Sequence, residues 1–398
     1  MTEASLPVPP ITERPDVVAL LDKVPLTAAE QRATKIVCCV TGSTGMVGSH
    51  VARRLLRAGH TVHAPVRSLD EEKVGFLKAM PGADERLKLF KVTNLLDAGA
   101  YDESIAGCEV VLHVASPFFM VGSQQQIQEK LLEPAVAGIE NILASCSQTP
   151  TVKRVVLTGT CLTAAADYAP SLEDPDWTVT EEDWDETTSP TDFPYVHSKI
   201  LQERRAEEIE AGQSQWELVS LLIGGTFGPM CFTKATGINA MFLKYVRMGL
   251  FFPACPPVGF PMQDVRDAAL MHSLAMISPN AKGRYLIPQR LVRFYEFCNV
   301  LKSDDRTKWK LLPMFEMPKF FFKWLFTKVG PLLGLDKSLP QRMWGNTVNF
   351  DLTKVNRDFD LPGQGYEPIH IRESMVDMDL SFQKFRVSNF SKSLDRYS

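Results

Sequence analysis

The sequence lacks the features of a membrane-spanning or disulfide-rich secreted protein. Its 398 residues contain no uninterrupted apolar run of about 18 residues, which a spanning helix needs. The eight cysteines form no CxxC pair, and several lie in apolar runs such as VCCV and ASCS, as reduced core cysteines do. The N-terminus, MTEASLPVPPITERPD, has prolines and acids where a secretory signal has basic and then apolar residues. We therefore expect a cytoplasmic protein without a transmembrane segment.

An excess of positive charge is also missing. The formal net charge is −4, so there is no basic footprint for nucleic acid. The 45% of apolar and 23% of charged residues are near the averages for soluble proteins, which argues against a disordered or fibrous chain. The length suffices for one large or two ordinary domains with a substantial core, and we expect no metal site.

Short apolar runs alternate with helical patterns over residues 35–228. The runs are IVCCVTG, TVHAPV, LKLFKV, CEVVLHVAS, KRVVLTG and ELVSLLIGG. Strands this apolar, separated by helices, are typical of a parallel sheet covered on both faces. The pattern predicts an α/β protein with a Rossmann-type, doubly wound sheet.

The rest of the chain is less regular. Residues 1–34 are Pro-rich, and we interpret them as an extension that is ordered only if it docks on the body. Prolines and aromatics become frequent after residue 229, which predicts a smaller lobe, mainly 229–398, that caps the substrate. We expect the chain to return to the Rossmann domain near 262–290.

A glycine-rich stretch, TGSTGMVGSH, connects the first predicted strand to a helix. We expect Gly42 to form the tight turn, Gly45 to let the backbone approach a pyrophosphate and Gly48 to let the helix pack closely. The free N–H groups at the helix start would then bind phosphates. The alternative is a glycine-rich turn without a ligand.

The end of the second predicted strand bears on the choice of cofactor. NAD-binding units carry an acid there for the ribose hydroxyls, whereas TVHAPV is followed by Arg67 and no carboxylate. A guanidinium matches phosphate geometry, and Lys73 is a second candidate one loop later. The pattern favours NADPH/NADP+. Alternatively, Arg67 is an ordinary surface charge beside the acids at 70–72.

Tyr195 and Lys199 are four residues apart in DFPYVHSKILQERRAEEIEAG, on one face of a predicted helix. A phenol with a pKa of about 10 is a poor acid–base catalyst at neutral pH. One ammonium about 4 Å away contributes roughly 4 kcal/mol at an effective dielectric near 20, or about three pKa units. We therefore expect Lys199 to lower the pKa of Tyr195. The alternative is an exposed aromatic–lysine pair on a surface helix.

The chain resembles an extended short-chain dehydrogenase/reductase, within the dihydroflavonol reductase-like group that includes cinnamoyl-CoA reductases. The resemblance extends from about residue 35 to 385. Its segments are VTGSTGMVGSHVARRLLRAGHTVHAPVR, DAGAYDESIAGCEVVLHVASP, EPAVAGIENIL with VKRVVLTGT, DETTSPTDFPYVHSK, GFPMQDVRDAAL, and FDLTKVNRDF with GYEPIHIRES. Six segments in the family's order are far more specific than one motif.

The resemblance implies a catalytic Ser or Thr, a Tyr and a Lys. Tyr195 and Lys199 match directly. The family usually has TSS at the end of the strand, where this chain has Thr158-Gly159-Thr160, so the hydroxyl role falls to Thr160. Thr158 and Thr163 are its competitors.

The resemblance also implies the cofactor-binding positions. They are Thr41, Gly42, Thr44, Gly45, Met46, Gly48, Arg67, Lys73, Asn94, Leu95, Val114, Ala115, Ser116, Tyr195 and Lys199. Asn94 replaces an aspartate of the family near the adenine and can still hydrogen-bond a base. We interpret His113, at a strand end, as non-catalytic.

The predicted function is NADPH-dependent reduction of a ketone or aldehyde in a small apolar or aromatic substrate, with Tyr195 as proton donor. The alternatives are NAD-dependent oxidation of the 3β-hydroxysteroid dehydrogenase type and a non-catalytic NADP-sensing protein. As a reductase or as a steroid dehydrogenase, the protein would act on a small-molecule carbonyl or alcohol. We expect it to be a monomer or a homodimer.

Two aromatic features of the capping lobe bear on its partners. Phe227, Phe232, Phe242, Phe251 and Phe252, with the run 319–326, favour an apolar substrate, although such aromatics are more often core than pocket. Lysines among the aromatics of 319–328 indicate weak contact with a membrane surface as a further hypothesis.

Overall fold

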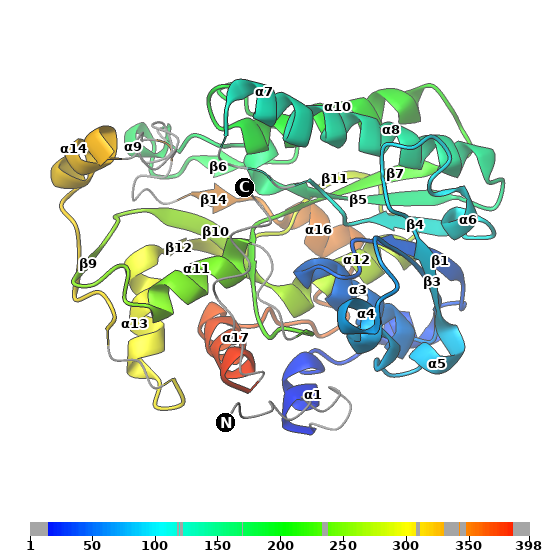
Figure 1. The fold of residues 1–398 in the computed structure, drawn as a ribbon, viewed down its shortest axis with the longest axis horizontal. Helices are drawn as coiled ribbons and strands as arrows, with labels where there is room; N and C mark the ends of the chain where they lie inside the picture. Colours follow the sequence, from blue (N-terminus) through cyan, green and yellow to red (C-terminus); the bar gives the residue numbers. More distant parts are fainter. Residues whose placement is uncertain are drawn as a thin grey trace, which may run out of the picture.

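The computed structural model describes residues 15–117, 119, 122–168, 170–232, 238–307, 311–329, 342 and 348–384. Its centre is a seven-stranded parallel sheet with the order β3-β2-β1-β4-β5-β7-β11 (Figure 1). The strands are β1 (Val37–Thr41), β2 (Thr61–Val66), β3 (Leu87–Lys91), β4 (Val110–His113), β5 (Arg154–Thr160), β7 (Glu217–Ile223) and β11 (Gly283–Leu286). The strand order reverses between β1 and β4, which creates a crevice at their carboxyl ends.

Helices cover both faces of this sheet because its central strands are buried on both sides. One face carries α3 (Met46–Arg57) and α12 (Val265–Ile277), and the other carries α8 (Glu133–Gln148) and α10 (Pro194–Ala211) (Figure 1). Shorter helices flank them. They are α4 (Glu71–Lys78), α5 (Ala83–Arg86), α6 (Asp102–Ile105), α7 (Gln124–Ile127) and α16 (Thr353–Asp358), with a π-helical turn at Gln128–Leu132. The predicted doubly wound α/β sheet is confirmed.

The remaining elements form smaller sheets and a helical layer beside the main sheet. One small sheet consists of β8 (Gly225–Phe227), β10 (Gly259–Asp264) and β12 (Arg290–Arg293). Two further sheets have two strands each: β9 (Ala254–Cys255) with β13 (Phe315–Glu316), and β6 (Thr178–Val179) with β14 (Asn349–Phe350). The helices are α9 (Pro170–Glu173), α11 (Ile238–Arg247), α13 (Phe294–Ser303), α14 (Lys319–Val329) and α17 (Ile371–Lys384). The return of the chain through α12 and β11 lies within the range 262–290.

Most of the aromatic residues singled out in the sequence belong to the core of this region. The ring of Phe242 lies 4.7 Å from that of Phe294 and 6.4 Å from that of Phe227, in edge-to-face contacts that stabilise a core. Phe251 joins the same cluster at 4.7 Å from Phe294, and Phe232 packs on Phe76 instead. These four rings therefore belong to the hydrophobic core or pack against it, and Phe252 is the one of the five that is exposed.

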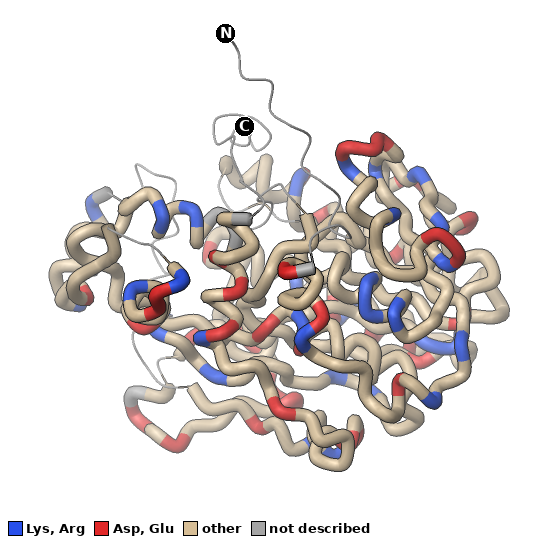
Figure 2. The backbone as a smooth tube through the Cα atoms, turned by 90° about the horizontal axis from the view of Figure 1, so that it is seen from below, with Lys and Arg blue, Asp and Glu red and all other residues tan. Residues whose placement is uncertain are grey.

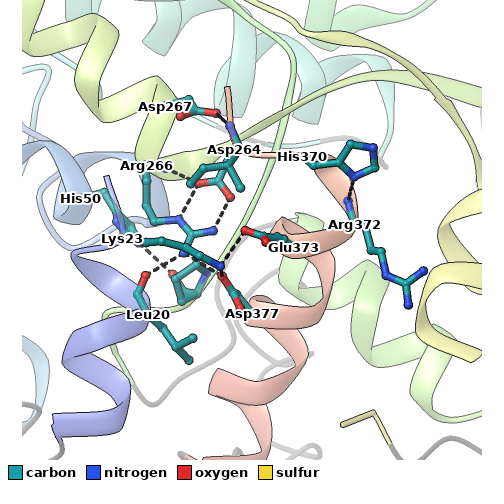
Figure 3. A network of polar contacts seen from close by, with 12 residues as sticks. Leu20, Lys23, His50, Asp264, Arg266, Asp267, His370, Arg372, Glu373 and Asp377 are labelled. Atoms are coloured by element: carbon teal, nitrogen blue, oxygen red, sulfur yellow. Dashed lines mark hydrogen bonds and ion pairs between the residues drawn. The ribbon is translucent and has the colours of Figure 1, made fainter. Parts of the chain in front are cut away.

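The described part of the N-terminal extension docks on the body through helices α1 (Pro15–Leu21) and α2 (Ala28–Arg32). Buried Arg266 of α12 donates to the Leu20 carbonyl oxygen (2.7 Å) and forms ion pairs with Asp264 (2.6 Å) and Asp377 of α17 (2.8 Å), as Figure 3 shows. The network holds segments from both ends of the chain against α12.

The cysteines, the charges and the helix lengths can also be described for this part of the chain. All eight cysteines are buried and free. Figure 2 shows acidic and basic residues interspersed along the chain. No helix among the described residues is long and apolar enough to cross a membrane. The same residues contain no group of three or more His, Cys, Asp or Glu side chains placed to hold a metal ion.

Candidate active site

The glycine-rich loop lies at the carboxyl end of β1 and leads into α3. Gly42 has φ +71°, a left-handed conformation, and its carbonyl accepts a hydrogen bond from the Gly45 N–H at 2.8 Å. A Cβ atom on Gly48 would lie 2.2 Å from the Gly42 oxygen, and one on Gly42 would lie 2.8 Å from the Ala115 nitrogen. The helix therefore packs on the loop at a distance that only glycine permits.

The first turn of α3 offers hydrogen-bond donors to an anion. Gly45 is the N-cap residue and has no side chain to accept from the N–H groups that follow, which have no acceptor within the helix. No acidic residue lies in this turn, and the helix dipole favours negative charge there. Thr44 and Met46 are half-buried beside these donors. The loop thus fits a pyrophosphate.

Thr41 joins the ends of β1 and β4. Its hydroxyl oxygen accepts from the N–H groups of Val114 (3.1 Å) and Ala115 (3.0 Å), so its hydrogen points to Nδ1 of His113 at 2.9 Å. Burial, with a smaller contribution from the Lys199 charge, lowers the pKa of His113 to about 3. His113 is therefore neutral at neutral pH. Ser116, three residues further along the chain, is exposed.

The remaining predicted cofactor residues lie at the ends of β2 and β3. Arg67 is exposed and forms no ion pair with any described residue, whereas Lys73 pairs with Asp70 at 2.9 Å. Asn94 is exposed and hydrogen-bonds Asp97 at 2.6 Å. The half-buried Leu95 accepts a hydrogen bond from Asn141 through its carbonyl at 3.0 Å. Of the two predicted cations, Arg67 is thus the one without a carboxylate partner in the described part of the chain.

Three threonines follow one another at the end of β5, and two have hydroxyls engaged elsewhere. Thr158 hydrogen-bonds Nε2 of His272 in α12 at 2.8 Å. Thr163 donates toward Glu203 at 2.8 Å and accepts from Arg284. Thr160 accepts a long hydrogen bond of 3.4 Å from the Leu162 N–H, and its side chain also interacts with the neighbouring Cys161. Thr160 therefore has the least engaged hydroxyl of the three.

Tyr195 and Lys199 lie in the first turns of α10, as the sequence predicts. The helix begins at Pro194, after Phe193 in a left-handed conformation with φ 59°. Tyr195 is half-buried, and Lys199 is buried with 4% of its surface exposed. Lys199 donates to the Thr158 carbonyl oxygen and to Oε1 of Gln202, both at 3.0 Å. These bonds fix the ammonium beside the end of β5.

The expectation that Lys199 lowers the pKa of Tyr195 is wrong for this structure. Burial, assisted by nearby Cys161, raises the pKa of Tyr195 to about 12. Burial also lowers the pKa of Lys199 to about 8, although the Glu203 charge opposes that shift. Loss of water around the two groups outweighs the attraction that helical spacing alone predicted.

Gln202 is a residue of this site that was not predicted from the sequence. Its side chain is 2% exposed and holds one of the three N–H groups of Lys199, leaving one without a partner among the described residues. The i, i+3 spacing of Lys199 and Gln202 was the available signal, because such residues are neighbours on a helix.

Comparison with known proteins identifies the family. The model of the NAD dependent epimerase/dehydratase family matches residues 38–250. The chain belongs to this family. A cinnamoyl-CoA reductase of Medicago truncatula is 33% identical over 71% of this chain and 83% of its own. A dihydroflavonol 4-reductase of Callistephus chinensis is 28% identical over 80% of this chain and 79% of its own. The predicted resemblance is confirmed.

Solved structures of two reductases share the fold. Gre2 of Candida albicans, in complex with NADPH, has a TM-score of 0.70 and 21% identity over 88% of this chain and 99% of its own. Vestitone reductase from alfalfa has a TM-score of 0.62 and 21% identity over 89% of this chain and all of its own. The named relatives are reductases, which supports the predicted class of NADP-dependent oxidoreductase.

Proposed function

We propose that the protein is an NADPH-dependent reductase of a ketone or aldehyde carbonyl in a small apolar or aromatic substrate. The observation that carries the proposal is the position of Thr160, Tyr195 and Lys199 on elements that pack together at the crevice where the glycine loop begins α3. When bound, NADPH supplies the hydride.

Each of the three residues has a role that its surroundings support. Tyr195 is a neutral phenol at neutral pH, because its pKa is about 12, and it donates the proton to the substrate oxygen. The Thr160 hydroxyl donates to the same oxygen where negative charge develops. Lys199 stabilises the phenolate that Tyr195 leaves, and its third N–H binds the nicotinamide ribose.

The glycine loop and Arg67 bind the cofactor's phosphates in this proposal. The donors at the start of α3 would hold the pyrophosphate, and Arg67 would hold the 2′-phosphate, whose geometry a guanidinium matches. Asn94, Val114, Ala115 and Ser116 line the adenosine and ribose side.

We expect Arg67→Ala to raise the KM for NADPH about tenfold or more and to change the KM for NADH little, since only NADPH carries the 2′-phosphate. Steady-state kinetics with both cofactors measure this difference. Lys73→Ala is the matched control, because Lys73 pairs with Asp70. Equal changes for the two cofactors would place the 2′-phosphate site elsewhere.

The kcat/KM for reduction should fall as the pH rises through about 8, where Lys199 loses its proton. The ammonium is present below that pKa, so the rate is full there and drops about tenfold per pH unit above it. A pH profile of kcat/KM, which reports on the free enzyme, measures the inflection. In Lys199→Arg the guanidinium stays charged, so any remaining activity should show no inflection near pH 8. If the inflection near pH 8 persisted in Lys199→Arg, a group other than Lys199 would be its source.

The substrate class rests on the relatives' names, since four of the five phenylalanines singled out between residues 227 and 252 pack in the core. Fluorescence titration with NADPH and NADH tests cofactor binding first. A panel of aldehydes, ketones, steroids, cinnamoyl-CoA and a dihydroflavonol then tests turnover. Reduction of any carbonyl with NADPH supports the proposal. NAD-dependent oxidation of a steroid alone, or NADPH binding without turnover, would contradict it.

A further inference from the structure

The described residues expose their large apolar side chains mainly at one end of the molecule. Nine of the eleven such side chains lie within residues 248–252 and 311–324, and Leu69 and Leu96 are the other two. We call residues 248–252 and 311–324 the apolar face. Contiguous exposed apolar surface is unusual on a protein that works alone in water.

The two segments of the apolar face lie side by side. Strands β9 and β13 pair in parallel, and the Met314 N–H donates to the Pro253 oxygen at 2.7 Å. A Cβ atom on Gly249 would lie 2.9 Å from Cβ of Leu311, so the segments touch there as well. Figure 1 shows α14 at one end of the long axis of the molecule, away from the central sheet.

Helix α14 has one apolar side that packs and one that does not. Phe322 is buried, and its ring lies 5.5 Å from that of Phe326 on the side toward the core. Phe320 is 78% exposed and Trp324 is 58% exposed, with Trp324 stacked on the partly exposed Phe321 at 5.8 Å. Contact with the core therefore explains Phe322 and Phe326 but not the three outward rings.

The charge of this region is opposite to that of the whole chain. Residues 311–329 contain three exposed lysines, at 319, 323 and 328, and one acid, Glu316. Glu316 pairs with Arg293, so its charge is balanced locally. The chain as a whole has a net charge of −4. The outward face of α14 is therefore aromatic and basic.

We propose that α14 and the rest of the apolar face lie on the surface of an anionic lipid membrane. The outward aromatic rings enter the boundary between headgroups and acyl chains, and the lysines bind anionic headgroups while their stems cover apolar surface. A second copy of the chain is a poorer partner, because a two-fold interface would bring the α14 lysines of both copies together. This surface is separate from the proposed reaction, which needs no membrane.

Vesicle flotation of the full chain tests the proposal. We expect the protein to float with vesicles of phosphatidylcholine and phosphatidylserine at low salt, and to bind them about tenfold more weakly at high salt or without phosphatidylserine. Phe320→Ser/Phe321→Ser/Trp324→Ser should weaken binding about tenfold or more. Leu69→Ser/Leu96→Ser, which changes the other two exposed apolar side chains, should bind as the unchanged protein does.

Circular dichroism and NADPH binding show that each variant is folded. Failure of the unchanged protein to float with the anionic vesicles would overturn the proposal, as would equal binding by the triple variant. Equal binding to vesicles of phosphatidylcholine alone would overturn the role of the lysines. A dimer in solution that the triple variant converts to a monomer, without flotation, would assign the apolar face to self-association instead.

Discussion

Replacing Tyr195 by phenylalanine should lower kcat about 10²–10⁴-fold, the usual contribution of a positioned general acid. The change removes only the hydroxyl and keeps the ring, on a helix that contacts β5 and η3 (Cys161–Thr163). The affinity for NADPH should stay within about twofold, because Arg67 and the α3 donors are unchanged. Single-turnover kinetics and fluorescence titration measure the two effects separately.

Tyr285→Phe is the matched control for this experiment. Its hydroxyl donates to Asp358 at 2.9 Å, away from the glycine loop, so its removal should leave kcat within about twofold. If Tyr195→Phe also turned over at the unchanged rate, another group would be the proton donor. If it lost NADPH binding as well, Tyr195 would act in binding the cofactor rather than in proton transfer.

The parallel sheet could be predicted because its signal is local. Runs such as IVCCV and TVHAPV are apolar throughout, and only a strand buried on both faces requires that pattern. β11 gave no such signal, since its sequence, GRYL, is short and opens with a glycine and an arginine. Arg284 is nevertheless buried, because Glu203 pairs with it at 3.1 Å. A partner 81 residues away in the sequence cannot be inferred from the strand itself.

The placement of the candidate residues on their helix and loop was predictable, but their electrostatics was not. Helical spacing places Tyr195 and Lys199 on one face of α10. The glycine spacing predicts a tight loop before α3, and in the structure Gly42 of this loop lies close to the Ala115 backbone. The pKa values depend on burial, which comes from packing between elements that are distant in the sequence, such as β5 and α10. That packing raises the pKa of Tyr195 to about 12 and lowers that of Lys199 to about 8, changes that no spacing reports.

The docking of the N-terminal segment had a sequence signal that was overlooked. Thr27 and Glu30 form a capping box: the Glu30 N–H donates to Oγ1 of Thr27 at 3.3 Å, and the Thr27 N–H donates to Oε2 of Glu30 at 2.8 Å. A threonine followed by a glutamate three residues later predicts a helix start. What the sequence does not give is the partner of Glu30, which is Arg54 of α3.

Glu30→Ala should lower the free energy of unfolding by about 3–5 kcal/mol, because it leaves a buried guanidinium without its carboxylate. Glu30 is fully buried and accepts from Nε (2.7 Å) and Nη2 (2.6 Å) of Arg54 and from the Ser273 hydroxyl (2.6 Å). The pair therefore links α2 to both α3 and α12. Urea denaturation of the unchanged protein and the variant measures the loss.

The difference in the free energy of unfolding between the unchanged protein and Glu30→Ala should become smaller at acid pH. Burial alone would raise the pKa of Glu30, but hydrogen bonding and charge from Arg54 lower it below its ordinary value. The stabilisation is therefore present above the unfolded pKa of about 4.3 and is lost as the pH falls through the folded value. Glu71→Ala, which breaks an exposed pair with Lys78, is the control and should cost about 0–1 kcal/mol. A similarly small loss in Glu30→Ala would mean that apolar contacts of α1 and α2, rather than the ion pair, hold the N-terminal segment in place.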